Sequence, residues 1–168
     1  MKKDKEFRTV RGYQRLNSEN KILTSCLEDY LEMIYRIYLQ DEFIRINQLA
    51  KKLNVRPSSA TKVVQKLNSL NMVNYEKYEI IKLTNEGIET GKYLLRRHNI
   101  IEEFLKKIGV EESLLKDTEM IEHDMSIKTV ECLFAFNEFL ECKPSICMEY
   151  IEFKNNICKE LDMYNDEC

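Results

Sequence analysis

The stretch INQLAKKLNVRPSSATKVVQKL, residues 46–67, decides how the N-terminal half of this chain folds. Its first eight residues repeat apolar side chains at the spacing of one face of a short helix. Asn54-Val55-Arg56 then predicts a brief turn, and Pro57 suits the first position of a second helix, where its missing N–H costs nothing. Two short helices joined by such a turn predict a helix-turn-helix.

The segments on both sides predict the rest of a winged helix-turn-helix. Residues 25–39 place apolar side chains at helical spacing, so we expect a helix there. Residues 72–75 and 80–83 are rich in β-branched and aromatic residues, with the polar residues 76–79 between them. This pattern is typical of a two-stranded hairpin, which would form the wing.

The C-terminal half is expected to be helical throughout. Thr84 can cap a long helix that runs to about Lys107, and we expect further helices at about 111–124, 126–141 and 144–161. With four glycines and two prolines in 168 residues, the chain favours long helices over tight turns. The predicted fold is mainly α: a basic N-terminal arm (1–24), a winged helix-turn-helix with a two-stranded wing (25–92) and a helical metal-binding and dimerisation domain (93–168).

Charge is divided unevenly along the chain. Residues 1–21 carry seven basic against three acidic residues, and residues 45–82 carry eight against two. Residues 99–168 carry seven basic against seventeen acidic residues. A basic front and an acidic back are typical of a nucleic-acid reader with a separate regulatory part, although any single run of charges is more often a solvated surface.

The second helix of a helix-turn-helix lies in the major groove, so its exposed face should read DNA. A winged helix can also serve protein contacts alone, but the positive charge of this region favours a polyanion. The candidate DNA-binding residues are those of the second helix and of the wing: Arg56, Ser58, Ser59, Thr61, Lys62, Gln65, Lys77 and Tyr78.

Cysteines and apolar runs argue against other classes of protein. The six cysteines include no Cys-x-x-Cys pair and none lies beside a histidine, so a thiolate zinc site is poorly supported. No apolar run approaches the roughly 18 residues that a membrane helix needs. The N-terminus carries charges where a signal peptide needs an apolar stretch, so we expect a cytoplasmic protein without membrane contact.

Both histidines of the chain lie in the sequence among carboxylates. Asp29 and Glu32 are three residues apart on the first predicted helix and should share a face. Glu119, Glu122 and His123 have the same one-face spacing on a later helix, and His98 lies near the middle of the long helix. Oxygen ligands with imidazole and no thiolate suit Mn²⁺ or Fe²⁺. Each fragment alone also fits a charged surface or a satisfied core histidine.

Five stretches in the same order resemble the diphtheria-toxin-repressor (iron-dependent repressor) family, most closely its manganese transport regulator branch. They are EDYLEMIY (28–35), VRPSSATKVVQKL (55–67), NYEKYEIIKLTNEG (74–87), RRHNIIEEFL (96–105) and IEHDMS (121–126). The resemblance implies a repressor whose metal ligands fall on Asp29, Glu32, His98, Glu119, Glu122 and His123. It also implies a cluster of two metal ions with shared carboxylates.

The resemblance favours Mn²⁺, with Fe²⁺ as the alternative. The iron-responsive branch has a methionine where this chain has Asp29 and a cysteine where it has Glu119, and harder ligands favour Mn²⁺. We expect a homodimer that binds double-stranded operator DNA and regulates metal homeostasis. Its interface is expected in the C-terminal helices, through apolar residues that could equally complete an internal core, such as Leu133, Phe134, Phe136, Phe139 and Leu140.

Two other functions remain open on the sequence alone. One is a dinuclear-metal enzyme, but such sites often pair Glu-x-x-His motifs and have no place for a helix-turn-helix. The other is a metal-independent winged-helix regulator that senses a small ligand or a partner. The sequence supports no catalytic residue, and we do not expect an enzyme.

Overall fold

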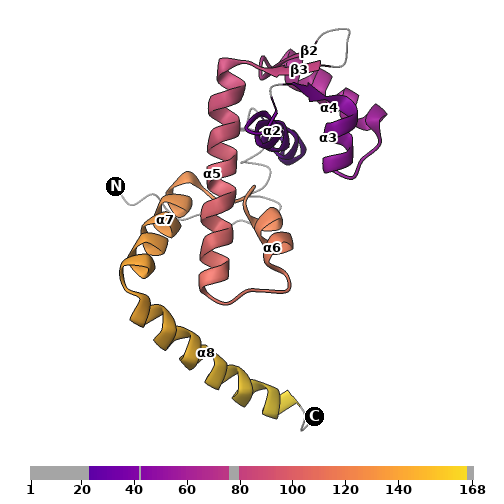
Figure 1. Cartoon of the computed structure of the whole chain (residues 1–168). Helices are drawn as coiled ribbons and strands as arrows, with labels where there is room; N and C mark the ends of the chain where they lie inside the picture. Colours follow the sequence, from indigo (N-terminus) through magenta and orange to yellow (C-terminus); the bar gives the residue numbers. More distant parts are fainter. Residues whose placement is uncertain (1–22, 42, 76–79, 166–168) are drawn as a thin grey trace, which may run out of the picture. The chain divides into compact units, whose positions relative to one another are not determined.

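The computed structural model describes residues 23–41, 43–75 and 80–165, with side chains up to residue 157 (Figure 1). Its contacts divide the chain into two compact units, one up to Arg96 and one from Arg97 onward. The helices are α2 (Ser25–Tyr38), α3 (Ile46–Lys52), α4 (Pro57–Ser69), α5 (Asn85–Lys107), α6 (Leu114–Ile121), α7 (Ile127–Cys142) and α8 (Pro144–Asn165). The strands are β1 (Ile44–Arg45), β2 (Val73–Tyr75) and β3 (Ile80–Leu83).

The helix-turn-helix forms where the sequence predicts it. Helix α3 ends at a turn in which Asn54 adopts a φ of 53°, a left-handed conformation that asparagine tolerates better than most residues. Pro57 then begins α4. Leu49 of α3 and Leu67 of α4 are fully buried in the core of this unit, and α2 packs against both helices. The buried apolar face of residues 46–67 therefore holds α4, the predicted DNA-reading helix, in place.

The wing is a part of a three-stranded antiparallel sheet in the order β1-β3-β2. The sequence predicted the β2–β3 hairpin but not β1, which is two residues long and pairs Ile44 with Ile81. A two-residue strand has no detectable periodicity, and its pairing depends on the burial of Ile44. The hairpin loop, residues 76–79, lies outside the described residues.

Helix α5 contacts its neighbours in the first unit through two glycines. A Cβ on Gly91 would lie 2.6 Å from Cβ of Tyr35, so α5 and α2 approach too closely for any side chain there. A Cβ on Gly87 would lie 1.9 Å from the carbonyl oxygen of Met72. Thr84 accepts a hydrogen bond from the Gly87 N–H at 2.9 Å, which confirms its predicted role as the cap of α5.

The second unit has a smaller core around Ile101 and Val130. Helix α6 is shorter than predicted: it begins at Leu114 and ends at Ile121, because turns replace helix on both sides. Ser126 caps α7 by accepting a hydrogen bond from the Thr129 N–H at 3.2 Å. Within the described residues, none of the helices is both long and apolar enough to span a membrane.

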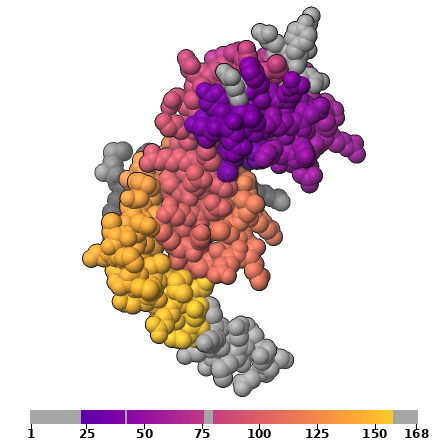
Figure 2. Space-filling model, in the orientation of Figure 1, coloured from indigo at the N-terminus to yellow at the C-terminus, as the bar shows by residue number. Residues whose placement is uncertain are grey.

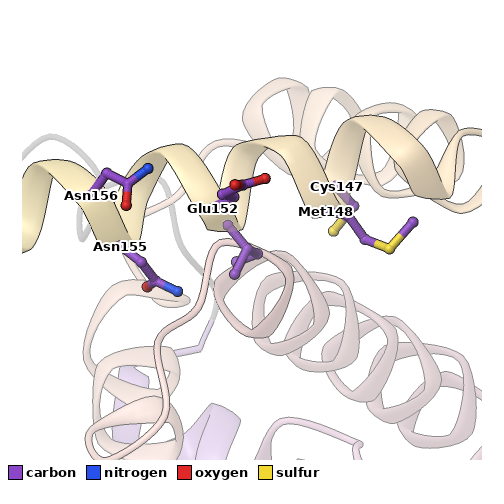
Figure 3. Close-up of a pocket in the computed structure, with 6 residues that line it drawn as sticks. Cys147, Met148, Glu152, Asn155 and Asn156 are labelled. Atoms are coloured by element: carbon purple, nitrogen blue, oxygen red, sulfur yellow. The ribbon is translucent and has the colours of Figure 1, made fainter.

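One side of α8 packs against the end of α5 and the loop that follows it. Lys154 Nζ donates a hydrogen bond of 2.6 Å to the carbonyl of Gly109, and Ile151 lies beside the same glycine. A groove of about 470 Å³ runs along α8 between Cys147 and Asn156 (Figure 3). The groove contains none of the candidate metal ligands.

Candidate metal centre and DNA-reading helix

Glu122 and His98 form the centre of the cluster in the second unit. Their side chains are 1% and 2% exposed, and His98 Nδ1 lies 2.9 Å from Glu122 Oε2. A carboxylate can only accept, so the His98 Nδ1–H donates and the lone pair of the ring is at Nε2. A carboxylate that orients an imidazole in this way is the usual support for a histidine metal ligand.

Glu119 and His123 extend this cluster. Glu119 Oε1 lies 3.7 Å from His98 Nδ1, and His123 Nε2 lies 3.7 Å from Glu122 Oε1. Glu119, Glu122 and His123 can each offer a ligand atom within 4.8 Å of the other two. The sequence placed all three on one helix, but α6 ends at Ile121. Glu122 still has helical dihedral angles (φ −62°, ψ −31°), which maintains the helical direction as far as that residue.

The other two predicted ligands lie on α2 in the first unit. Asp29 is half-buried, and Glu32 is buried and accepts hydrogen bonds from Arg36 Nε at 2.9 Å and Nη2 at 2.7 Å. Both hydrogen bonds end on Oε1, so Arg36 holds the Glu32 carboxylate in one orientation. Because α2 packs on α3 and α4, both carboxylates are attached to the helix-turn-helix.

Oxygen and nitrogen are the donor atoms of these residues. No cysteine of the described part of the chain belongs to a group of converging potential ligands. Burial and the nearby charge of Asp29 raise the pKa of the Cys26 thiol, which keeps it protonated and a poor ligand at neutral pH. The donor set fits a hard divalent cation such as Mn²⁺ or Fe²⁺ better than a structural zinc ion.

The reading helix α4 exposes most of the predicted DNA-binding residues. Arg56, Ser58, Ser59, Lys62 and Gln65 are exposed at its start and along its outer face. Thr61 is half-buried, and its hydroxyl donates to the Pro57 carbonyl at 2.9 Å. Lys77 and Tyr78 of the wing lie outside the described residues.

Sequence reasoning missed Arg97 and Asn137, which are among the buried polar residues of the second unit. Arg97 is 4% exposed, and its Nη2 lies 3.6 Å from Glu122 Oε1 and 3.3 Å from His123 Nδ1. Asn137 is 1% exposed and donates to the Ile100 carbonyl at 2.9 Å. Arginine and asparagine are usually exposed, so composition gives no sign that either is buried.

The apolar residues of α7 divide between two faces. Leu140 is buried and Leu133 packs partly against the core of this unit, so these two complete the interior. Phe134, Phe136 and Phe139 are between 38% and 44% exposed. Figure 2 shows the surface of α7 continuing into that of α8, from orange to yellow.

Comparison with known proteins identifies the family. Residues 22–81 match the iron-dependent repressor N-terminal DNA-binding domain. Residues 84–149 match the metal-binding and dimerisation domain of the same repressors. The boundary between the two matches falls at the start of α5.

Individual relatives agree with these matches. The transcriptional regulator MntR of Lysinibacillus sphaericus (strain C3-41) is 39% identical over 124 residues, which cover 73% of this chain and 89% of that protein. MntR of Bacillus subtilis (strain 168) is 40% identical over 119 residues, covering 70% and 84%. The solved structure of the manganese regulator SloR superposes with a TM-score of 0.60 at 31% identity, covering 67% of this chain and 54% of that one. This chain thus spans about half the length of that structure.

The chain belongs to the iron-dependent repressor family. It is a metal-responsive, DNA-binding transcriptional repressor with a winged helix-turn-helix and a helical second part, and not an enzyme. The fold and family that the sequence predicted are confirmed.

Proposed function

We propose that this repressor responds to Mn²⁺, and that Asp29, Glu32, His98, Glu119, Glu122 and His123 hold the ion or a pair of ions. The observation that carries the proposal is the convergence of His98, Glu119 and His123 around the buried carboxylate of Glu122. The names of the MntR relatives and the carboxylate at position 119 favour Mn²⁺ over Fe²⁺.

Control of DNA binding follows from where the six ligands lie in the chain. Asp29 and Glu32 lie on α2, which packs on the helix-turn-helix in the first unit, whereas the other four belong to the second unit. Four carboxylates repel one another when they gather without a counter-charge, and a divalent cation supplies that charge. When the ion draws the ligands together, the first unit moves less freely relative to the second before it meets DNA. Less conformational entropy is then lost when the first unit binds DNA.

The repressor should act as a two-fold homodimer. Two reading helices related by a two-fold axis address half-sites about 34 Å apart or a multiple of that distance. The dimer contact we propose consists of seven of the exposed apolar side chains of α7 and α8. They are Phe134, Phe136, Phe139, Ile146, Tyr150, Phe153 and Ile157, and their number exceeds what a small monomer usually exposes.

The test is a DNA-retardation assay across Mn²⁺, Fe²⁺, Co²⁺ and Zn²⁺, with a chelator control. The DNA is a set of fragments selected from a random pool by the Mn²⁺-loaded chain. We expect retardation with Mn²⁺, loss with the chelator and a weaker response to the later metals at the concentrations that a cell maintains. Equal retardation with and without chelator contradicts the proposal and favours a metal-independent regulator.

A double variant separates the metal site from the fold. Glu119→Ala combined with His123→Ala should abolish Mn²⁺-dependent retardation, whereas Glu111→Ala, which removes an exposed carboxylate before α6, should not. Hydrogen exchange over residues 25–100 should slow when Mn²⁺ is added to the wild-type chain. Equal protection in both states would refute the stiffening mechanism. Equilibrium dialysis at saturation counts the ions, and about one ion per chain would contradict the pair.

A further inference from the structure

The cluster of candidate ligands already contains a cation. Arg97 lies on the part of α5 that belongs to the second unit, and its side chain is 4% exposed. A guanidinium group remains charged at any ordinary pH. Its Nη2 lies 3.3 Å from His123 Nδ1 and 3.6 Å from Glu122 Oε1, so this positive charge lies between two residues that we propose as metal ligands.

The contact with Arg97 decides which nitrogen of His123 carries a proton. A guanidinium group has donors only, so His123 Nδ1 must accept. The ring proton of a neutral His123 is then on Nε2, which faces Glu122 Oε1 at 3.7 Å. In this arrangement neither ring nitrogen has a lone pair for a metal ion, because Arg97 occupies one and a proton the other.

Metal binding at His123 therefore requires a change at Arg97. If the ion binds Nδ1, it takes the lone pair that Arg97 now uses. If the ion binds Nε2, the proton moves to Nδ1, where it would point at the N–H groups of the guanidinium. Neither mode of ligation is compatible with the present hydrogen bond.

We propose that Arg97 is an internal counter-cation that stabilises the ligand cluster of the metal-free repressor and competes with the metal for His123. The inference rests on the proposed function, because it assumes that His123 is a ligand. It predicts that Arg97 raises the metal concentration at which the repressor responds. If Arg97 instead only positioned His123 for the metal, its removal would weaken metal binding, so the sign of the change distinguishes the two roles.

The experiment compares Arg97→Gln with Arg96→Gln, which removes the same charge from the neighbouring, exposed position. We expect Arg97→Gln to lower the Tm of the metal-free chain and to tighten the Kd for Mn²⁺, measured by calorimetry, on the order of tenfold, because a competing positive charge is removed. Arg96→Gln should leave both values near those of the wild type. A folded Arg97→Gln chain with unchanged or weaker Mn²⁺ binding overturns the inference.

A second measurement needs neither metal nor a variant. The chain has two histidines, so ¹⁵N NMR of the metal-free wild type resolves both rings. We expect opposite tautomers: His98 protonated at Nδ1, which donates to Glu122, and His123 protonated at Nε2. A proton on Nδ1 of His123 overturns the inference. Failure of the wild type to bind Mn²⁺ would instead refute the proposed function and leave the tautomer result to stand by itself.

Discussion

Asn137 connects the two main helices of the second unit through hydrogen bonds on both its side chain and its backbone. Its side-chain amide donates to the Ile100 carbonyl of α5 at 2.9 Å, and its backbone carbonyl accepts from Lys107 Nζ at 2.9 Å. Burial by itself would lower the pKa of Lys107, but hydrogen bonds to Glu103 and Glu141 raise it, so Lys107 stays charged at neutral pH. The α5–α7 contact therefore combines a small apolar core with a buried amide.

Replacement of Asn137 should destabilise the second unit in a graded way. Asn137→Ala removes one buried hydrogen bond and should cost about 1–3 kcal/mol in the free energy of unfolding. Asn137→Asp should cost more, because a buried carboxylate would face the Ile100 carbonyl without a donor. Urea denaturation measures both, with Asn155→Asp on the exposed side of α8 as the control. Equal stability of the two Asp variants would contradict this role.

Residue types at helical spacing, together with the resemblance to the repressor family, selected His98, Glu119, Glu122 and His123, whose side chains the structure brings together. Spacing could not reveal Arg97 beside them. Its burial depends on a carboxylate and an imidazole that follow it by more than twenty residues, and contacts of that range leave no local pattern. The helix-turn-helix was predictable because its signals, a turn and an N-terminal proline, are local.

Helix α4 presents a residue that can read DNA sequence and a positive charge on its exposed surface. Gln65 can form a bidentate pair with an adenine edge, whereas Lys62 can only neutralise a phosphate as a point charge. Both are exposed, so neither contributes to the core that holds the helix-turn-helix together. Their replacement should therefore change DNA binding without changing the fold.

The two substitutions on α4 should have different signatures. Gln65→Ala should weaken binding to the selected DNA by about 1–3 kcal/mol and leave binding to unrelated DNA unchanged. Lys62→Ala should weaken both and reduce the slope of log K against log salt concentration by about 1. Fluorescence anisotropy across a salt series measures both effects. Identical losses on both DNAs for Gln65→Ala would contradict a base contact.

The close approach of α5 to α2 leaves no room for a side chain at Gly91. Gly91→Ala raises the helix propensity of α5 by about 1 kcal/mol, but its Cβ would clash with Tyr35. We expect the clash to dominate and the free energy of unfolding to fall by about 1–3 kcal/mol. Lys92→Ala, at the next and exposed position, should be close to neutral in the same urea titration. A stabilised Gly91→Ala chain would show that α2 moves away without cost.

Each of the two units has its own core, and α5 contributes buried residues to both cores. Basic residues predominate over 45–82 and acidic residues over 99–168, so the reading part attracts DNA while the second part repels it. An acidic second part is therefore available for contact with another protein surface, and its exposed apolar residues on α7 and α8 give that contact a driving force.

The apolar residues of α8 follow the repeat of a helix that pairs with another helix. Ile146, Tyr150, Phe153 and Ile157 are separated by four, three and four residues, which is the alternation of a coiled-coil seam. The side of α8 that packs on its own unit carries Ile151 and Lys154 instead. The seam begins inside the matched dimerisation domain, which ends at residue 149, and continues beyond it. A second copy of the chain is the partner that this continuity favours.

A charge in the seam should therefore weaken the dimer. Phe153 is 62% exposed in the single chain, and Phe153→Glu would place a carboxylate in the contact, raising the dimer Kd by at least about tenfold. Met148→Glu is the matched control, because Met148 is 67% exposed but lines the groove on another side of α8 (Figure 3). Sedimentation equilibrium with Mn²⁺ present measures both constants. Equal weakening by both variants would mean that charge alone disrupts assembly, and no weakening by Phe153→Glu would assign the dimer contact to α7 alone.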